Sequence, residues 1–262
     1  MGQEAIMITA TRRRFTALAL ALGLVALSSC AEESTPDGQP ESDSSAAAEV
    51  AALLVTAEDL GDRWSELVPD PDVSFEDGVV TDENREWLPR LEFCPAASAE
   101  SQEAARNLPW QAFRQLNYDT GMAQPTAEPT PGSPPMQHHL VFLQEFLLRG
   151  DADDIEETYA ALAAGMEACT DQTIEYPDGE IGRGEPFDVP ALGDGSTGTR
   201  QLVAEPGAAR RAATWDLRNV LVRDGEYLVS LSFAEITSPK VEPQFDDAAV
   251  EQLVETVDAK LP

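Results

Sequence analysis

The sequence has few basic residues and almost no histidine. Its 17 lysines and arginines stand against 48 aspartates and glutamates, which gives a net charge of −31 at pH 7. A chain with this charge repels nucleic-acid phosphates and anionic lipid headgroups, so we exclude nucleic acid as a partner and expect no direct docking on a membrane surface. We interpret the charge as a means of solubility, and a specific cationic partner is the alternative.

The two histidines, His138 and His139, are adjacent in the chain. Neighbouring residues of a strand point to opposite faces, so these two cannot bind one metal ion in regular geometry, and we interpret them as surface residues where a loop enters a strand. No Gly-x-Ser-x-Gly nucleophile motif accompanies them. The sequence therefore predicts neither a histidine-based metal site nor a catalytic triad.

Two further segments resemble ligand-binding loops only in part. The acidic stretch from Asp70 to Glu83 lacks the fixed spacing of a hand-type calcium loop, so we expect a solvated acidic loop. The segment from Gly193 to Gly198 lacks the lysine of a phosphate-binding loop, and we interpret it as a turn. We predict no metal, no cofactor and no enzymatic activity. A hydrolase that uses two acidic residues is the least favoured alternative, because nothing in the sequence selects two carboxylates among many.

The apolar run from Phe15 to Leu27 is too short to span a bilayer as a helix, which takes roughly 20 residues. A basic cluster that includes Arg12 and Arg13 precedes it, and small residues follow it, which is the pattern of a secretory signal. The sequence Leu27-Ser28-Ser29-Cys30 resembles a bacterial lipobox. This resemblance implies a signal peptide over 1–29, cleavage before Cys30 and acylation of the Cys30 thiol.

Arg12 and Arg13 also fit the twin-arginine export motif, which a receptor reads and which is not an anchor. General secretion and twin-arginine export both stay open. After Cys30, residues 31–47 contain no large apolar side chain. Such a segment cannot bury enough surface to offset the entropy of ordering, so we predict a disordered tether over 30–47 and a globular domain over 48–262.

Two cysteines remain once Cys30 is acylated, namely Cys94 and Cys169. In an oxidising compartment an isolated pair in one domain is most simply a disulfide. A catalytic thiol is the weaker alternative, because Cys169 falls at the end of a predicted helix, where the helix dipole disfavours a thiolate.

The patterning of the folded part predicts an α+β fold in which a twisted antiparallel sheet carries flanking helices in a single domain. Thr56 and Asp59 form a capping box for a short helical turn that ends at Gly61. Strands are expected over 110–118 and 140–148, the second buried on both faces. A helix from 151 carries an apolar stripe that ends at Cys169. The tryptophans at 64, 110 and 215 are expected in the core.

The last part of the chain contains a hairpin and a terminal helix. Asp224-Gly225 lies between two strand-like runs, which is a strong signal for a two-residue turn with positive φ at both positions. The odd-numbered residues from Tyr227 to Phe233 are expected to face the core. A helix should begin near Phe245 and continue to the end of the chain.

These landmarks together resemble a known group of proteins. The resemblance uses the lipobox, the acidic tether, the 53–60 opening, the alanine-rich helix into Cys169, Leu192-Gly193-Asp194 and the Asp224-Gly225 hairpin before a terminal helix. The chain is similar, over most of 50–262, to actinobacterial lipoproteins related to the extracellular sensor domain of PknH-like kinases. That resemblance implies an antiparallel sheet with helices around a cleft that receives a ligand. The sensor domain usually has two disulfides, whereas this chain can form only one.

The favoured function is a ligand-binding or sensor-like module without catalysis, held on the extracytoplasmic face of the cell membrane by its lipid anchor. The ligand would be an unidentified small molecule, bound in a cleft between sheet and helix. An envelope lipoprotein that binds another envelope protein is the alternative. Neither the sequence nor the resemblance identifies ligand-binding residues.

Overall fold

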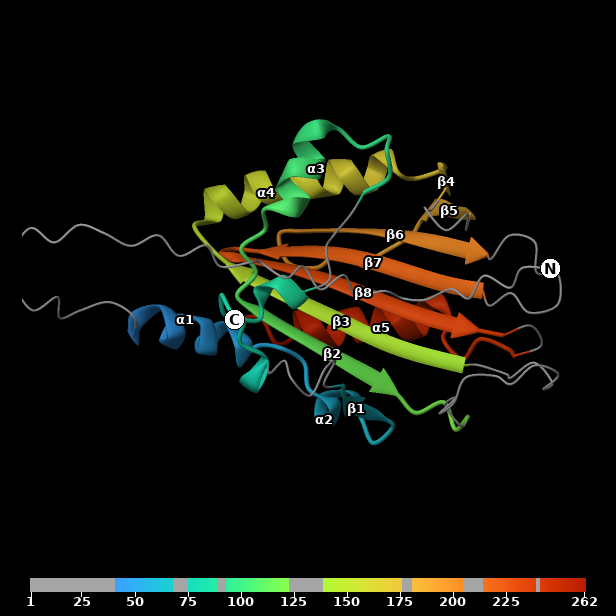
Figure 1. Ribbon diagram of the computed structural model, residues 1–262, viewed down its shortest axis with the longest axis horizontal. Coiled ribbons are helices and arrows are strands. Elements are labelled where there is room, and N and C mark those ends of the chain that lie inside the picture. Colours follow the sequence, from blue (N-terminus) through green and yellow to red (C-terminus); the bar gives the residue numbers. More distant parts are fainter. Residues whose placement is uncertain are drawn as a thin grey trace, which may run out of the picture. The chain divides into compact units, whose positions relative to one another are not determined.

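Eight strands form one antiparallel sheet, and helices cover both of its faces (Figure 1). The strands are β1 (Trp64–Glu66), β2 (Ala112–Tyr118), β3 (His139–Arg149), β4 (Thr173–Glu175), β5 (Ile181–Pro186), β6 (Gly195–Ala204), β7 (Thr214–Asp224) and β8 (Tyr227–Thr237). Their order across the sheet is β1-β2-β3-β8-β7-β6-β5-β4, and all neighbours are antiparallel. The α+β fold predicted from the sequence is confirmed.

The computed structural model describes residues 41–67, 75–88, 93–122, 139–175, 181–204, 214–238 and 241–262. They belong to one compact unit, Gln39–Pro262, as predicted for a single domain. Within these ranges, none of the helices combines the length and the apolar character that crossing a bilayer would require.

The sheet consists of two meanders that meet at its centre. Strands β1 to β3 follow one another in space as in sequence, and so do β4 to β8. The meanders join where β3 pairs with β8 along its whole length, from His139 opposite Thr237 to Arg149 opposite Tyr227. Helix α4 (Ala152–Ala168) follows β3 and starts the connection between them. The interior position of β3 agrees with its nearly continuous apolar sequence.

One face of the sheet packs against α1 (Glu41–Ala51) and α5 (Asp247–Asp258), and we call it the α5 face. Its core combines side chains from both helices and from the central strands, among them Val50, Leu143, Leu231 and Val254. The short helix α2 (Ala57–Leu60) packs at the edge of the same core. The ribbon in Figure 1 shows α5 behind the sheet.

The other face packs against α4 and, beside it, α3 (Ala99–Arg106), and we call it the α4 face. Ile155, Leu162 and Met166 of the predicted helical stripe are buried there against Phe146 and Leu228. Two short 3-10 turns, Glu76–Gly78 and Arg85–Trp87, lie between β1 and α3 in the chain. The sheet is therefore the middle layer of three.

Local signals near the start of the domain are confirmed. Thr56 Oγ1 accepts a hydrogen bond from the backbone N–H of Asp59 at 3.3 Å, and Asp59 Oδ2 accepts one from the N–H of Thr56 at 2.8 Å. The helix ends at Gly61, which has a φ of 101°. Trp64 and Trp110 are buried, but Trp215 is 37% exposed, so its expected place in the core is wrong.

The β7–β8 hairpin is confirmed, but its turn differs from the prediction. Asp224 pairs with Tyr227, so the two turn residues are Gly225 and Glu226. Of these only Gly225 has a positive φ, 54°, which fits a turn with glycine at its first central position. The odd-numbered residues Val229, Leu231 and Phe233 lie in the core of the α5 face as expected, and residues of the other face of β8 are buried as well, with Leu228 in the core under α4.

Two other expectations are corrected. Helix α1 begins at Glu41, so residues 41–47, which we assigned to the tether, are helical, and the expected domain start at 48 falls inside the helix. Serines and alanines tolerate a helix, and Val50 and Ala51 dock its last turn into the core. The segment 195–198, expected as a turn, is the first part of strand β6.

Candidate functional site

A groove of about 560 Å³ lies between α3 and α4 on the outer side of the α4 face. From α3 it is lined by Ala99, Glu100, Glu103 and Ala104, and from α4 by Asp154, Glu157, Thr158 and Ala161. Small residues on both helices leave the space open. A cleft was expected between sheet and helix, whereas this groove lies between two helices.

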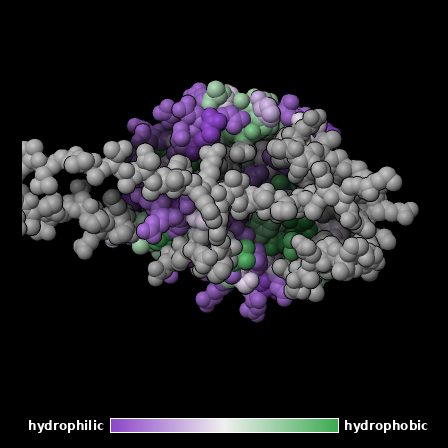
Figure 2. All heavy atoms as spheres, viewed as in Figure 1, coloured by the Kyte–Doolittle hydropathy of each residue, from purple (hydrophilic) through white to green (hydrophobic). Residues whose placement is uncertain are grey.

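The groove is strongly acidic. Glu100, Glu103, Asp154 and Glu157 are all exposed, and none of the lining residues that the structure describes is basic. Hydrophilic residues also cover the left part of α4 in Figure 2. A low-dielectric wall lined by charges of one sign concentrates their field, so the groove attracts cations and repels anions.

A disulfide holds the two walls of the groove together. Cys94 precedes α3, Cys169 ends α4, and their Cα atoms are 5.6 Å apart. Phe93 also packs on Gly165 of α4, so closely that an added Cβ there would lie 2.5 Å from the ring. Both cysteines are buried. The predicted pair is therefore confirmed, and it braces α3 against α4.

A second feature lies on the α4 face of the sheet, beyond the part that α4 covers. Along β3, residues 140, 142 and 144 are half-buried while their neighbours are buried, and along β7 residues 217 and 219 show the same alternation. We call the partly exposed side chains of β2, β3, β7 and β8 in this region the uncharged strip: Gln115, Asn117, Leu140, Phe142, Gln144, Trp215, Leu217, Asn219 and Ser232. Figure 2 shows hydrophobic residues in a hollow over the middle strands.

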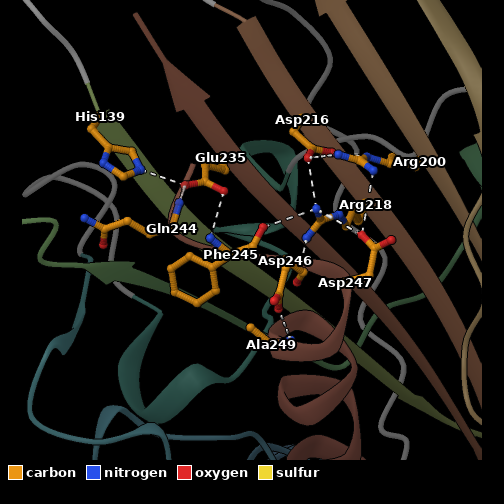
Figure 3. Close-up of polar contacts among 10 residues, drawn as sticks. All are labelled: His139, Arg200, Asp216, Arg218, Glu235, Gln244, Phe245, Asp246, Asp247 and Ala249. Carbon is orange, nitrogen blue, oxygen red and sulfur yellow. Dashed lines mark hydrogen bonds and ion pairs between the residues drawn. The ribbon is translucent and has the colours of Figure 1, made fainter. Parts of the chain in front are cut away.

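The opposite, α5 face contains buried charged groups (Figure 3). Glu235 of β8 is 1% exposed and accepts three hydrogen bonds, from His139 Nε2 at 2.7 Å and from the backbone N–H groups of Gln244 at 2.7 Å and Phe245 at 3.3 Å. Because Gln244 and Phe245 lead into α5, this carboxylate fixes where the helix approaches the sheet. His139 was expected at the surface, and this was wrong, because pairing with β8 covers it.

A neighbouring network centres on Arg218 of β7, whose side chain is 2% exposed. It contacts the carboxylates of Asp216 at 3.0 Å and Asp247 at 3.2 Å, and it donates to the backbone carbonyl of Phe245 at 3.3 Å. Arg200 binds Asp216 with two hydrogen bonds of 2.8 and 2.6 Å, and these bonds raise the pKa of Arg200. The charges of the two arginines and the two aspartates thus compensate one another, while the buried Arg218 Nε has no hydrogen-bond partner among the described residues.

A third buried group, Glu145 of β3, contacts Val55 in the segment that follows α1. Its Oε2 accepts a hydrogen bond from the N–H of Val55 at 2.8 Å, and Arg114 donates to the carbonyl of Val55 at 3.3 Å. Burial raises the pKa of Glu145 to about 8. The carboxyl is therefore protonated at neutral pH and acts as a neutral acceptor.

The other predicted site residues are not part of the described ranges. Cys30, Arg12 and Arg13 precede them, and His138 falls in an interval between them. Asp70 and Asp72 of the acidic stretch lie in another interval. In the described ranges, no three His, Cys, Asp or Glu side chains form a group that could hold a metal ion.

Sequence reasoning missed both the groove and the uncharged strip. The alternation of Leu217 and Asn219 with buried residues of β7 could have indicated a partly exposed face of this strand. In β3 the apolar residues of both faces conceal the alternation. The groove had no local signal, because its two walls are distant in the sequence.

Comparisons with known proteins give little more. No family model matches the chain, and no curated protein matches it either. Among solved structures, the chain is similar to the crystal structure of the extracellular domain of PknH from Mycobacterium tuberculosis, with 11% identity and a TM-score of 0.42 over 81% of this chain and 94% of that one. This is a weak structural resemblance, and it carries no argument about function.

Proposed function

We propose that the chain is an extracytoplasmic lipoprotein, anchored by acyl groups on Cys30, whose folded part binds a ligand without catalysis. The observation that supports its compartment is the disulfide between Cys94 and Cys169. Disulfides form and persist in oxidising compartments and are rare in the cytosol. The lipobox before Cys30 supports the anchor.

The groove between α3 and α4 is the proposed binding site. Its volume of about 560 Å³ falls within the range of known small-molecule pockets. The disulfide fixes its walls, and preformed walls lower the entropic cost of binding. Because four carboxylates line it, the ligand we expect is a small organic cation.

The composition of the groove supports binding over catalysis. Thr158 is the only hydroxyl residue among the described residues of its lining, and these include no histidine, cysteine or lysine that could activate it. A carboxylate-based hydrolase would need a carboxyl with a raised pKa in the groove. Glu145 and Asp258 have raised pKa values, and neither lines it.

The anchor is tested by growing the native host with an alkyne-tagged fatty acid. We expect label on the wild-type chain and none on Cys30→Ala. The intact mass of the mature protein should equal that of a chain that starts at Cys30 and carries acyl groups on it. An unlabelled wild-type chain, or one that keeps residues 1–29, would refute the anchoring.

The binding site is tested with spermidine as the probe in thermal-shift and calorimetric titrations of the full chain. A ligand at 100 times its Kd should stabilise the protein by about 2.7 kcal/mol. The double variant Glu103→Gln and Glu157→Gln should lose most of this effect. The matched control, Glu242→Gln with Glu255→Gln, removes the same charge from exposed positions elsewhere. Equal responses of the two double variants would show that only net charge is sensed.

A further inference from the structure

The uncharged strip is unusual for this molecule because none of its side chains is charged, although the chain carries 48 acidic residues. Its four strands, β2, β3, β8 and β7, are neighbours in the sheet. At the usual spacings of strands and residues, the strip measures about 15 Å across and about 13 Å along. It shares no residue with the α3–α4 groove.

Neutral hydrogen-bonding groups run across the middle of the strip. Gln144 Nε2 donates to Gln115 Oε1 at 3.0 Å, between β3 and β2, and Ser232 Oγ donates to Asn219 Oδ1 at 2.6 Å, between β8 and β7. Each amide has both a donor and an acceptor group, and these described contacts use only one of the two. The row can therefore both donate to a ligand and accept from it.

Apolar side chains lie beside this row, toward the end of the strip that is farther from α4. Phe142 and Leu217 come next to the amide row, and Leu140 and Trp215 follow one step farther along their strands. Trp215 is 37% exposed and Phe142 is half-buried. A ligand on the strip would thus contact a polar row and an apolar platform at once.

This combination selects one chemical class of ligand. A charged ligand would be desolvated with no counter-charge in the strip, which is unfavourable. A purely apolar ligand would cover the amide row and leave its donors and acceptors unpaired. A sugar has hydroxyl groups that both donate and accept, and C–H faces that pack on apolar and aromatic side chains.

We propose that the uncharged strip binds a neutral glycan. The amides of Gln115, Gln144 and Asn219 would bind its hydroxyl groups, and Phe142 and Trp215 would contact its apolar faces. The proposal depends only on the sheet, and neither on the lipid anchor nor on the groove. It therefore survives if either part of the proposed function fails.

The test measures binding of neutral oligosaccharides (maltohexaose, cellohexaose and mannohexaose) to the full chain by calorimetry, beside an anionic oligogalacturonate and a cationic chitosan hexamer. Gln144→Glu places a charge in the strip with almost no change of shape, and it should weaken binding of the neutral sugar about tenfold or more. Gln252→Glu makes the same change at an exposed position of α5 and should leave binding unchanged.

Trp215 gives an independent readout that does not depend on the Gln144 variant being folded. Binding on the strip should shift the tryptophan emission of the wild type, and Trp215→Phe should remove that shift while calorimetry still detects the sugar. The proposal is overturned if no neutral oligosaccharide binds, if only the charged oligomers, an aliphatic detergent or a peptide bind, or if a folded Gln144→Glu variant binds like the wild type.

Discussion

Glu145 provides the sharpest test of the energetics, because its carboxyl group is enclosed by the fold and burial raises its pKa. It lies on the α5 face and is 2% exposed, and it accepts one hydrogen bond from the N–H of Val55. The charged groups that act on it are Arg114 and Lys260, which favour ionisation, and Asp59, which opposes it. Desolvation outweighs them and raises the pKa of Glu145 from 4.5 to about 8.

The sign of the pH effect follows from linkage. Because the folded pKa lies above the unfolded one, the contribution of Glu145 to stability is complete below pH 4.5 and is lost as the pH rises through 8. With 1.36 kcal/mol for each pKa unit, the free energy of unfolding should fall by about 3 kcal/mol between pH 5 and pH 8 because of this group alone. Glu145→Gln keeps the acceptor for Val55 and has no proton to lose.

The measurement is denaturant unfolding of wild type and Glu145→Gln at pH 5 and pH 8, with Glu255→Gln, exposed on α5, as the matched control. The stability of Glu145→Gln relative to wild type should increase by about 3 kcal/mol between the two pH values, whereas that of the control should hardly change. Because every other titrating group is common to both chains, this difference isolates Glu145. If the difference in the free energy of unfolding between wild type and Glu145→Gln is the same at pH 5 and pH 8, the carboxyl titrates normally and the reasoning is wrong.

Two further predictions concern the disulfide and the Arg218 network. Replacing Cys94 and Cys169 by serine should lower the free energy of unfolding by about 4–5 kcal/mol, since the bond closes a segment with a sequence separation of 75, and a loss below about 1 kcal/mol in denaturant titrations would contradict this. Asp216→Leu should destabilise by about 3–5 kcal/mol, because it leaves the buried Arg218 without its partner in β7. A loss of stability in Asp216→Leu no larger than that in Asp188→Leu, at an exposed site, would refute this role.

Local chemistry determined which parts of the fold were predictable. The capping box at Thr56 and Asp59 closes over three residues, so the chain itself specifies it. The stripe from Ile155 to Cys169 specifies a helix and also the side on which Cys169 is buried. Two remaining cysteines allow one pairing. In these cases, the information lies within one segment or in simple counting.

Errors arose where a partner from another part of the chain decides the outcome. His139 is polar and follows another histidine, which is typical of a surface, yet Glu235, 96 residues away, buries it in a hydrogen bond. Trp215 is large and apolar, which is typical of a core, yet it lies at the start of β7, and the α4 core reaches this face of β7 only farther along, at Leu221. Helix α1 has a weakly apolar sequence and gains its place from Val50 and Ala51 at one end. Tertiary context, not propensity, settled each of these.

We infer that the two faces of the sheet have different roles, because buried polar side chains on the α5 face hold segments of the fold, whereas the strip on the α4 face has no charged side chain. On the α5 face, Glu145, Glu235 and Arg218 each bind backbone groups of a segment that adjoins α1 or α5. A buried polar group accepts few alternative partners, whether it is charged, as Arg218 is, or neutral, as the protonated Glu145 is, so each of these contacts fixes where one segment docks.

On the α4 face, the disulfide holds α3 to α4 and the strip beyond them has no charge to satisfy. Substitutions of Glu145, Glu235 or Arg218 should therefore change the free energy of unfolding and leave sugar affinity unchanged. Substitutions of Gln144 should change sugar affinity and leave the free energy of unfolding unchanged. A variant such as Asp216→Leu that lost sugar binding while still folded would break this division, because Asp216 lies on the opposite face of the sheet from the strip.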